Sequence, residues 1–441
     1  MTSFRSAIFL GVSITVISYL YNHCTQLPPV MSGSSSFEFR PVAHTYKGLL
    51  QSGLEQGSSF VVYHADNNVV NFRGGYTDLR FLLPWSSETV TQSFTLSLLS
   101  VPFTFALLRE RLLINLTDPL AKYIPSFSVP DITVSDLLTH QSGFPYFLDF
   151  VSLTQWGENY RAVLKNITHQ VPSVAPKKRV MHLHSLALLA DAIVRKVDAR
   201  ERSLGHYFLE EVVWPLGIDI LLGIPRSQHY RAARTYHADW FSVLQALVRF
   251  DFRYLWTNLR SNPWMPYGGS REKTVNLFSD YKLLLNWHPD LLELPLASSN
   301  MFTNARGLAR LFQLLLPHAR HGCPLHQDNN SDTNQKCYNF NNETVNWMLS
   351  AHDSTAFEDP VLRRPLALTA SGLMMSTSPE GNPIFGMWDD IMGQMVFLDP
   401  ARRLTVAYMT NHAHGRSLSQ DPIISSLVQS VYSCLTNPGA V

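Results

Sequence analysis

The sequence has no excess of charge of either sign. Its 35 Lys and Arg residues stand against 34 Asp and Glu residues, which leaves a formal net charge of +1 over 441 residues. A surface that binds nucleic acid would need a basic excess, so no nucleic acid is expected as a partner. The 45% share of apolar residues is instead typical of a globular chain that buries a large core.

Cysteine is scarce, and no Cys-x-x-Cys or His-x-x-x-His spacing occurs, so the sequence predicts neither a metal site nor a cofactor. Cys323 and Cys337 flank the polar segment CPLHQDNNSDTNQKC. This pattern predicts a local disulfide that closes a surface loop in an oxidising compartment, with two free thiols as the alternative. The pairing of Cys24 and Cys434 is left open.

Long hydrophobic runs are also missing, apart from about fifteen residues between Ala7 and Tyr21. That length is marginal for a spanning helix and typical of the apolar part of a signal sequence. Residues 1–26 are therefore predicted to be a signal anchor or signal peptide. An uncleaved anchor is favoured because no small-x-small cleavage site follows, and Arg5 would keep the N-terminus cytoplasmic.

The membrane is accordingly an expected partner, and the folded domain is expected on the lumenal or extracellular side. The absence of acidic residues before Glu38 leaves a mitochondrial presequence as the alternative. Four Asn-x-Ser/Thr sequons are candidate glycosylation sites in such a compartment. They lie at Asn115, Asn166, Asn329 and Asn342.

Residues 27–36, LPPVMSGSSS, predict a linker, and the domain is expected to occupy residues 37–441. Apolar periodicity predicts amphipathic helices over residues 39–52, 180–197 and 421–435. Alternating apolar residues predict a hairpin from residues 58–63 and 69–72. A mostly helical subdomain is expected over about residues 126–290, and the Cys-flanked loop occupies residues 323–337.

The segment from Pro84 to Pro125 begins PWSSETVTQSFTLSLLS and continues as an apolar stretch to Asp118-Pro119. It resembles the serine β-lactamase-like family, which comprises class C β-lactamases, penicillin-binding proteins and related esterases. The family pattern is roughly PW-x-x-DT-x-x-x-x-F-S-x-x-K, followed by an apolar helix. Aligned without a gap, the nucleophile position is Thr95 and the lysine position is Leu98.

Further segments carry the same resemblance. They are VVNFRGGY, ITVSDLLTHQSGF, PLGIDILLGIP, NARGLARLF and IFGMWDDIMGQMVFLDP. The resemblance implies an α+β fold, with an antiparallel sheet flanked by helices and a mostly helical subdomain. It also places Met181 where the family has its catalytic Tyr, and Met387 at the third motif, where Trp388 and Asp389 follow.

Three apolar residues thus stand where the family exchanges protons or contacts substrate. Ser-x-x-Lys chemistry needs an amine beside the hydroxyl, and leucine supplies none. The sequence therefore predicts a catalytically inactive domain that acts by binding or scaffolding an unknown small molecule or protein. Pro102 is expected to kink or distort the helix near Leu98.

The alternative is a serine-type esterase or peptidase with rearranged groups. Thr95, Ser97 or Ser100 would then be the nucleophile. His182 or His184 would be the base, because both follow the position of the lost Tyr.

Overall fold

A computed structural model describes residues 30–51, 55–147, 153–236, 288–316, 339–353, 356–390, 392–414 and 421–436, together with positions 13, 16 and 28. The N-terminal segment that predicts an anchor therefore lies almost entirely outside the described residues. So do Cys24, Cys323, Cys337 and Asn329, and the part of the predicted helical subdomain between residues 237 and 287. Among the helices that are described, none has the length and hydropathy needed to cross a membrane.

A large antiparallel sheet organises the described chain, with the strand order β1-β3-β2-β13-β12-β11-β10-β9-β8. Its strands are β1 (Met31–Ser35), β2 (Gly57–His64), β3 (Asn67–Asp78), β8 (Phe357–Asp359), β9 (Arg364–Leu368), β10 (Met374–Thr377), β11 (Pro383–Asp389), β12 (Gln394–Asp399) and β13 (Leu404–Thr410), with β4 (Leu83–Pro84) paired to β3. Every residue of β12 and β13 is buried, so both faces of the sheet are covered there. The predicted α+β fold with a helix-flanked antiparallel sheet is confirmed.

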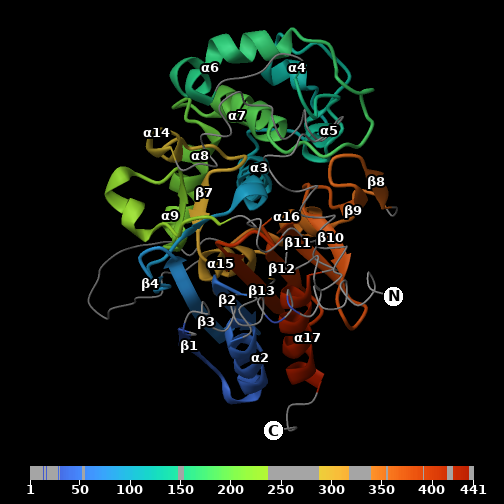
Figure 1. Cartoon of the computed structure of the whole chain (residues 1–441). Coiled ribbons are helices and arrows are strands. Elements are labelled where there is room, and N and C mark those ends of the chain that lie inside the picture. The colour runs from blue at the N-terminus through green and yellow to red at the C-terminus, as the bar shows by residue number, and fades with distance from the viewer. Residues whose placement is uncertain are drawn as a thin grey trace, which may run out of the picture.

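Alternation along the first hairpin decides which helix covers which face. Phe60 and Phe72 are directly paired in the register, and Tyr46 of α2 (Arg40–Gln51) stacks on Phe72 with ring centroids 5.7 Å apart. Ser59 points to the opposite face and accepts a hydrogen bond from the backbone N–H of Ala305, at the start of α15 (Ala305–Gln313). Helices α2 and α17 (Pro422–Thr436) therefore lie together on one side of the sheet and α15 on the other (Figure 1).

The remaining helices gather mainly above the sheet in Figure 1, with α4 to α7 at the far end and α3 between them and the strands. The helices are α3 (Ser100–Glu110), α4 (Leu120–Tyr123), α5 (Val134–Leu138), α6 (Leu153–Thr168), α7 (Ser185–Val197), α8 (Leu204–Phe208), α9 (Trp214–Leu216), α14 (Pro289–Leu292) and α16 (Asn342–Leu349), with 3-10 turns η1 (Phe37–Phe39), η2 (Phe94–Leu99) and η4 (Arg226–Arg231) and a π turn η3 (Leu209–Val213). A small sheet, in the order β5 (Thr91–Gln92), β7 (Met301–Thr303), β6 (Ile220–Leu222), joins this part to η2.

Two expectations need correction. The predicted linker, residues 27–36, contains β1, which pairs with β3 along five residues from Met31 to Ser35. Backbone hydrogen bonds pair this edge strand with β3. Backbone groups can form such bonds whether the residues are Gly, Ser or typical strand formers. The helix expected from residue 180 begins only at Ser185. In the segment before it, the backbone N–H of Met181 donates to Oδ2 of Asp359 over 2.6 Å.

Candidate functional site

The candidate site lies where η2 meets β11. Phe94 begins η2 in the left-handed region, at φ +38°, and its side chain is buried with Met392 and Ala413. After η2 the chain becomes α-helical at Ser100, so Pro102 falls in the first turn of α3. A missing N–H does little harm there, because the first N–H groups of a helix have no intrahelical partner. The distortion expected near Leu98 is therefore a junction between two helix types, and α3 itself continues to Glu110.

Thr95, which the sequence predicts at the position of the family nucleophile, is half-buried at the start of η2. Its backbone N–H donates to Oδ2 of Asp389 over 3.1 Å. The other oxygen of the same carboxylate accepts from the N–H of Met392 over 2.9 Å, in the turn that follows β11. Asp389 is 4% exposed, so this carboxylate lies inside the protein.

Asp389 is the site residue whose role the sequence left unassigned. The resemblance placed it two residues after Met387, the third-motif position, and gave it no role. The signal available in the sequence was an acidic residue at the turn of the third motif. Only the fold shows that its carboxylate accepts a hydrogen bond from the N–H of Thr95. Met387 lies two residues before Asp389 on β11 and therefore shares its sheet face.

The three positions that would exchange protons or contact substrate are apolar and closed to solvent. Leu98 and Met181 have no exposed surface, and Met387 is 2% exposed. All three belong to one continuous hydrophobic core. The segment around Met181 is fixed by Asp359 at the end of β8, and burial raises the pKa of that carboxyl. No side chain at these three positions can accept or donate a proton.

Ser97 and Ser100, the alternative nucleophiles, are fully buried and engaged in structural hydrogen bonds. Ser97 Oγ accepts from the N–H of Met301 over 3.1 Å and lies 3.3 Å from Ser93 Oγ. Ser100 Oγ donates to the carbonyl of Ser97 over 2.8 Å. These bonds attach η2 to β7 and to α3.

One of the alternative bases, His182, lies beside a different serine. His182 is fully buried, with Nε2 2.7 Å from Ser142 Oγ and Nδ1 2.5 Å from the carbonyl oxygen of Val180, while its backbone N–H donates to His140 Nδ1 over 3.1 Å. Burial lowers the pKa of His182 to about 4. His184 is 3% exposed and precedes α7. Thus His182 pairs with Ser142, which is itself fully buried.

The other predicted site residues fall on the surface or outside the described residues. Asn115, Asn166 and Asn342 are exposed, as a glycosylation acceptor must be, and their modification stays a prediction. Cys434 is a buried free thiol. Within the described part of the chain, no group of three or more His, Cys, Asp or Glu side chains is placed to hold a metal ion.

A family profile described as Beta-lactamase matches residues 42–428, which is most of the chain. The chain belongs to the β-lactamase family. A curated relative, the esterase/beta-lactamase LipL of Mycobacterium tuberculosis (strain ATCC 25618 / H37Rv), is 25% identical over 198 residues. This match covers 44% of the chain and 45% of the relative, so it spans less than half of either protein.

Solved structures of similar fold cover nearly the whole chain. EstA from Arthrobacter nitroguajacolicus Rue61a has a TM-score of 0.72 at 18% identity, over 93% of this chain and all of its own. A family VIII carboxylesterase has a TM-score of 0.69 at 20% identity, over 92% and 99%. A penicillin-binding protein homologue from Caulobacter crescentus has a TM-score of 0.67 at 20% identity, also over 92% and 99%. At these identities the likeness establishes the fold, and the chemistry has to be argued from the residues.

Proposed function

We propose that this β-lactamase family member is a pseudo-hydrolase that acts by binding or scaffolding. The observation that carries the proposal is the hydrogen bond from the Thr95 N–H to the carboxylate of Asp389. In acyl transfer, backbone N–H groups beside the nucleophile stabilise the negative charge of the tetrahedral intermediate. Here that donor already has a buried anionic acceptor, which would repel a second negative charge.

The apolar positions add to this argument. A Thr hydroxyl is a weak nucleophile unless a neighbouring base takes its proton. Leu98, Met181 and Met387 supply no such base. Catalytic residues act together, so the loss of one member removes most of the rate of the reaction. We also propose that residues 1–26 hold the domain at a membrane, on its lumenal or extracellular side.

The second candidate function is a serine-type esterase or peptidase. Similar solved structures include a family VIII carboxylesterase and EstA, and each covers more than nine-tenths of this chain. One contact also favours it, because Asp389 places a carboxylate next to Thr95. In this scheme Asp389, rather than His182 or His184, would take the Thr95 proton.

Hydrolysis of p-nitrophenyl butyrate by the purified chain, together with labelling by a fluorophosphonate probe, separates the two functions. The variants are Thr95→Ala, Thr95→Ser and Asp389→Asn. The pseudo-hydrolase predicts background hydrolysis and no labelling in all four proteins. The esterase predicts activity in the wild type, retained by Thr95→Ser and lost in Thr95→Ala and Asp389→Asn. Activity with that pattern would overturn the first proposal.

A further inference from the structure

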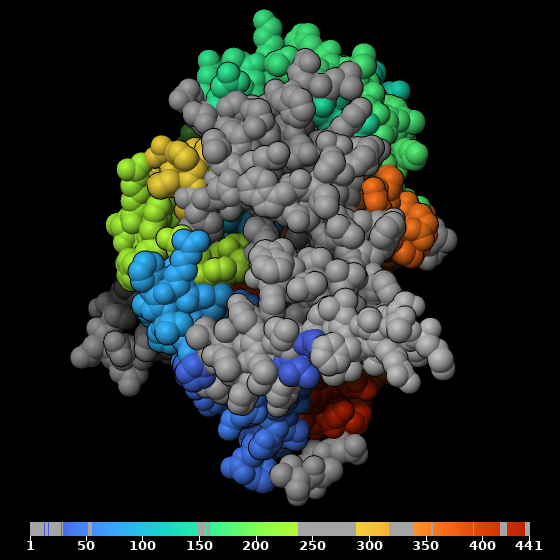
Figure 2. Space-filling model, in the orientation of Figure 1, coloured from blue at the N-terminus to red at the C-terminus, as the bar shows by residue number. Residues whose placement is uncertain are grey.

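A cavity whose lining does not include Thr95 lies between α15 and the hairpin of β2 and β3. Its volume is about 620 Å³, within the range of small-molecule sites. The walls come from β2 and β3, from α15 and from two loops, residues 85–88 and 217–219. Figure 2 shows these two loop regions beside each other, in light blue and yellow-green. None of Thr95, Leu98, Met181 and Met387 lines this space, which we name the α15 cavity.

The α15 cavity forms because α15 does not cover the whole sheet. The helix packs over β2, β12 and β13, whereas β3 extends beyond it. On the uncovered part, Asn71 and Arg73 point to the same face as Ser59 and Val61, their partners in the register. Ser59, Asn71 and Arg73 therefore give this part of the sheet face a polar surface that lines the cavity.

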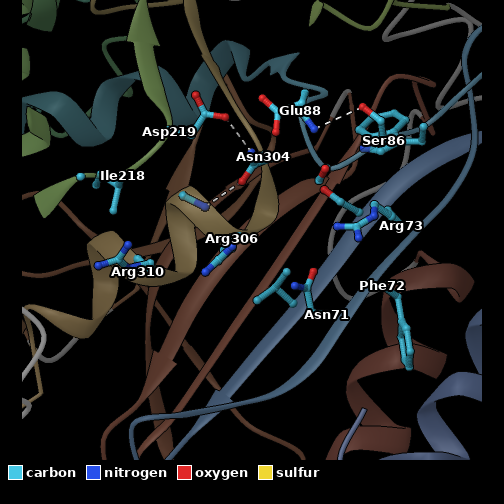
Figure 3. A pocket seen from close by; sticks show the side chains of 16 residues that line it. Asn71, Phe72, Arg73, Ser86, Glu88, Ile218, Asp219, Asn304, Arg306 and Arg310 are labelled. Carbon is cyan, nitrogen blue, oxygen red and sulfur yellow. Dashed lines mark hydrogen bonds between the residues drawn. The ribbon is translucent and has the colours of Figure 1, made fainter. Parts of the chain in front are cut away.

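Arginine dominates the charge of this surface. Arg306 and Arg310 stand one turn apart on α15, and Figure 3 shows Arg73 on the opposite wall. Two acids also line the cavity, but Asp219 already binds Arg231 over 2.5 Å and accepts from the Asn304 amide over 3.2 Å. Glu88 remains at the mouth, on the exposed loop. The guanidinium groups therefore outnumber the carboxylates available to them.

Arg306 and Arg310 have no carboxylate partner among the described residues. Arg310 is half-buried, and its one hydrogen bond there goes to the carbonyl of Leu216 over 3.2 Å. Burial lowers its pKa; Tyr63 raises it in part, and the like charge of Arg306 lowers it. Like charges four residues apart destabilise a helix. An anion between the two guanidinium groups would relieve both the repulsion and the lost solvation.

We propose that the α15 cavity binds a small organic anion, with a phosphate or carboxylate held by Arg306 and Arg310. The planar guanidinium fork suits both headgroups. Trp85 and Ile218 line the same space and provide apolar contact for the rest of the ligand. An added Cβ at Gly217 would meet no atom within 4 Å, so the cavity is open on that side. This binding is independent of any chemistry at Thr95.

Isothermal titration of the full chain tests the proposal with four probes: inorganic phosphate, hexyl phosphate, hexanoate and uncharged hexanol. We expect hexyl phosphate or hexanoate to bind more tightly than inorganic phosphate, and hexanol not to bind. The stronger of the two six-carbon anions identifies the headgroup. Failure of both to bind, or equal binding of hexanol, would overturn the proposal.

The variants are Arg306→Gln and Arg310→Met, with Arg40→Gln on α2 as the matched control because Arg40 is exposed and remote from the cavity. Each cavity variant should weaken binding of the six-carbon anion about tenfold or more, since a charged hydrogen bond is lost. Arg40→Gln should bind like the wild type.

Thermal unfolding without ligand provides the second measurement. Arg310→Met removes a desolvated, like-charged group, so its Tm should equal or exceed that of the wild type, while the ligand-induced rise in Tm disappears. A variant that gains as much Tm from the anion as the wild type would contradict the assignment.

Discussion

At the scale of single residues, Met181, which the sequence predicts at the position of the family's catalytic Tyr, belongs to a buried structural network. Met181 donates its N–H to Asp359, and the next residue, His182, contacts Ser142 and His140. Burial lowers the pKa of both histidines. His182, which directly follows Met181, is therefore a poor proton acceptor at neutral pH.

The buried His182 predicts a pH-dependent stability. Folded His182 takes a proton only near pH 4, whereas in the unfolded chain it does so near 6.5. The unfolded state therefore binds more protons between these values, and the stability that is fully present above pH 6.5 is lost as the pH falls towards 4. The loss from this group should be on the order of 3 kcal/mol.

Urea unfolding of the wild type and of His182→Gln across this pH range measures the effect. The glutamine amide can still reach Ser142 but does not titrate, so its free energy of unfolding should depend less on pH. His44→Gln, on the exposed side of α2, is the control and should keep the wild-type slope. An unchanged slope in His182→Gln would contradict the prediction.

Sequence reasoning assigned Thr95, Leu98, Met181 and Met387 to four family positions by alignment to motifs, and this assignment stays a prediction. It could not predict the contacts that the neighbours of these residues make. The role of Asp389 could not be predicted in this way. Its partner, the Thr95 N–H, lies nearly three hundred positions away and meets it only because β11 passes η2.

At the scale of elements, the edge of the large sheet depends on a strand whose composition predicts a linker. Gly33 in β1 has φ +112°, and a Cβ added there would lie 1.9 Å from the carbonyl oxygen of Asn71 on β3. Neither the conformation nor the spacing admits a side chain. Strand propensity failed here because backbone hydrogen bonds form most of the pairing, with one side-chain bond from Arg73 Nε to Ser32 Oγ over 3.0 Å.

Gly33→Ala should therefore release β1 from β3 and cost about 1–3 kcal/mol in unfolding free energy. Hydrogen exchange along Met31 to Ser35 should become fast. The matched control is Gly48→Ala, in α2, where an added Cβ meets nothing within 4 Å. That variant should gain about 0.5–1 kcal/mol, because alanine favours the helix. Unchanged exchange in Gly33→Ala would count against the strand.

At the scale of the whole molecule, one buried polar cluster joins the segment before β2 to the C-terminal segment around β13 and α17. Glu55 precedes β2, Tyr408 lies on β13, and His414 and Asp421 lie between β13 and α17. The Tyr408 hydroxyl donates to Glu55, and His414 Nδ1 lies 2.6 Å from Asp421 Oδ2. The other oxygen of Asp421 accepts from the N–H groups of Ile423 and Ile424, which caps α17.

Asp421→Asn should destabilise the protein by about 1.5–3 kcal/mol, because a charged acceptor serves both His414 and the helix. Burial raises the pKa of Asp421. His414 and the two N–H groups together lower it by more than that, so the net shift is downward. The stability from this carboxylate is present above its ordinary pKa of 3.8 and is lost as the pH falls through the lower folded value.

Denaturant unfolding at neutral and acid pH checks this prediction. Asp290→Asn is the control, since Asp290 pairs with Arg226 on the exposed surface and should cost less than about 1 kcal/mol. Equal losses in the two variants would contradict a special role for Asp421.

The pairing of β13 with β2 places one of the last strands of the chain beside one of the first, in the middle of the sheet. During synthesis, the hairpin of β2 and β3 leaves the ribosome with an open edge, and that edge stays unpaired until nearly all of the protein has been made. We therefore expect a chain that ends before β13 to present an unpaired strand edge and to be prone to aggregation.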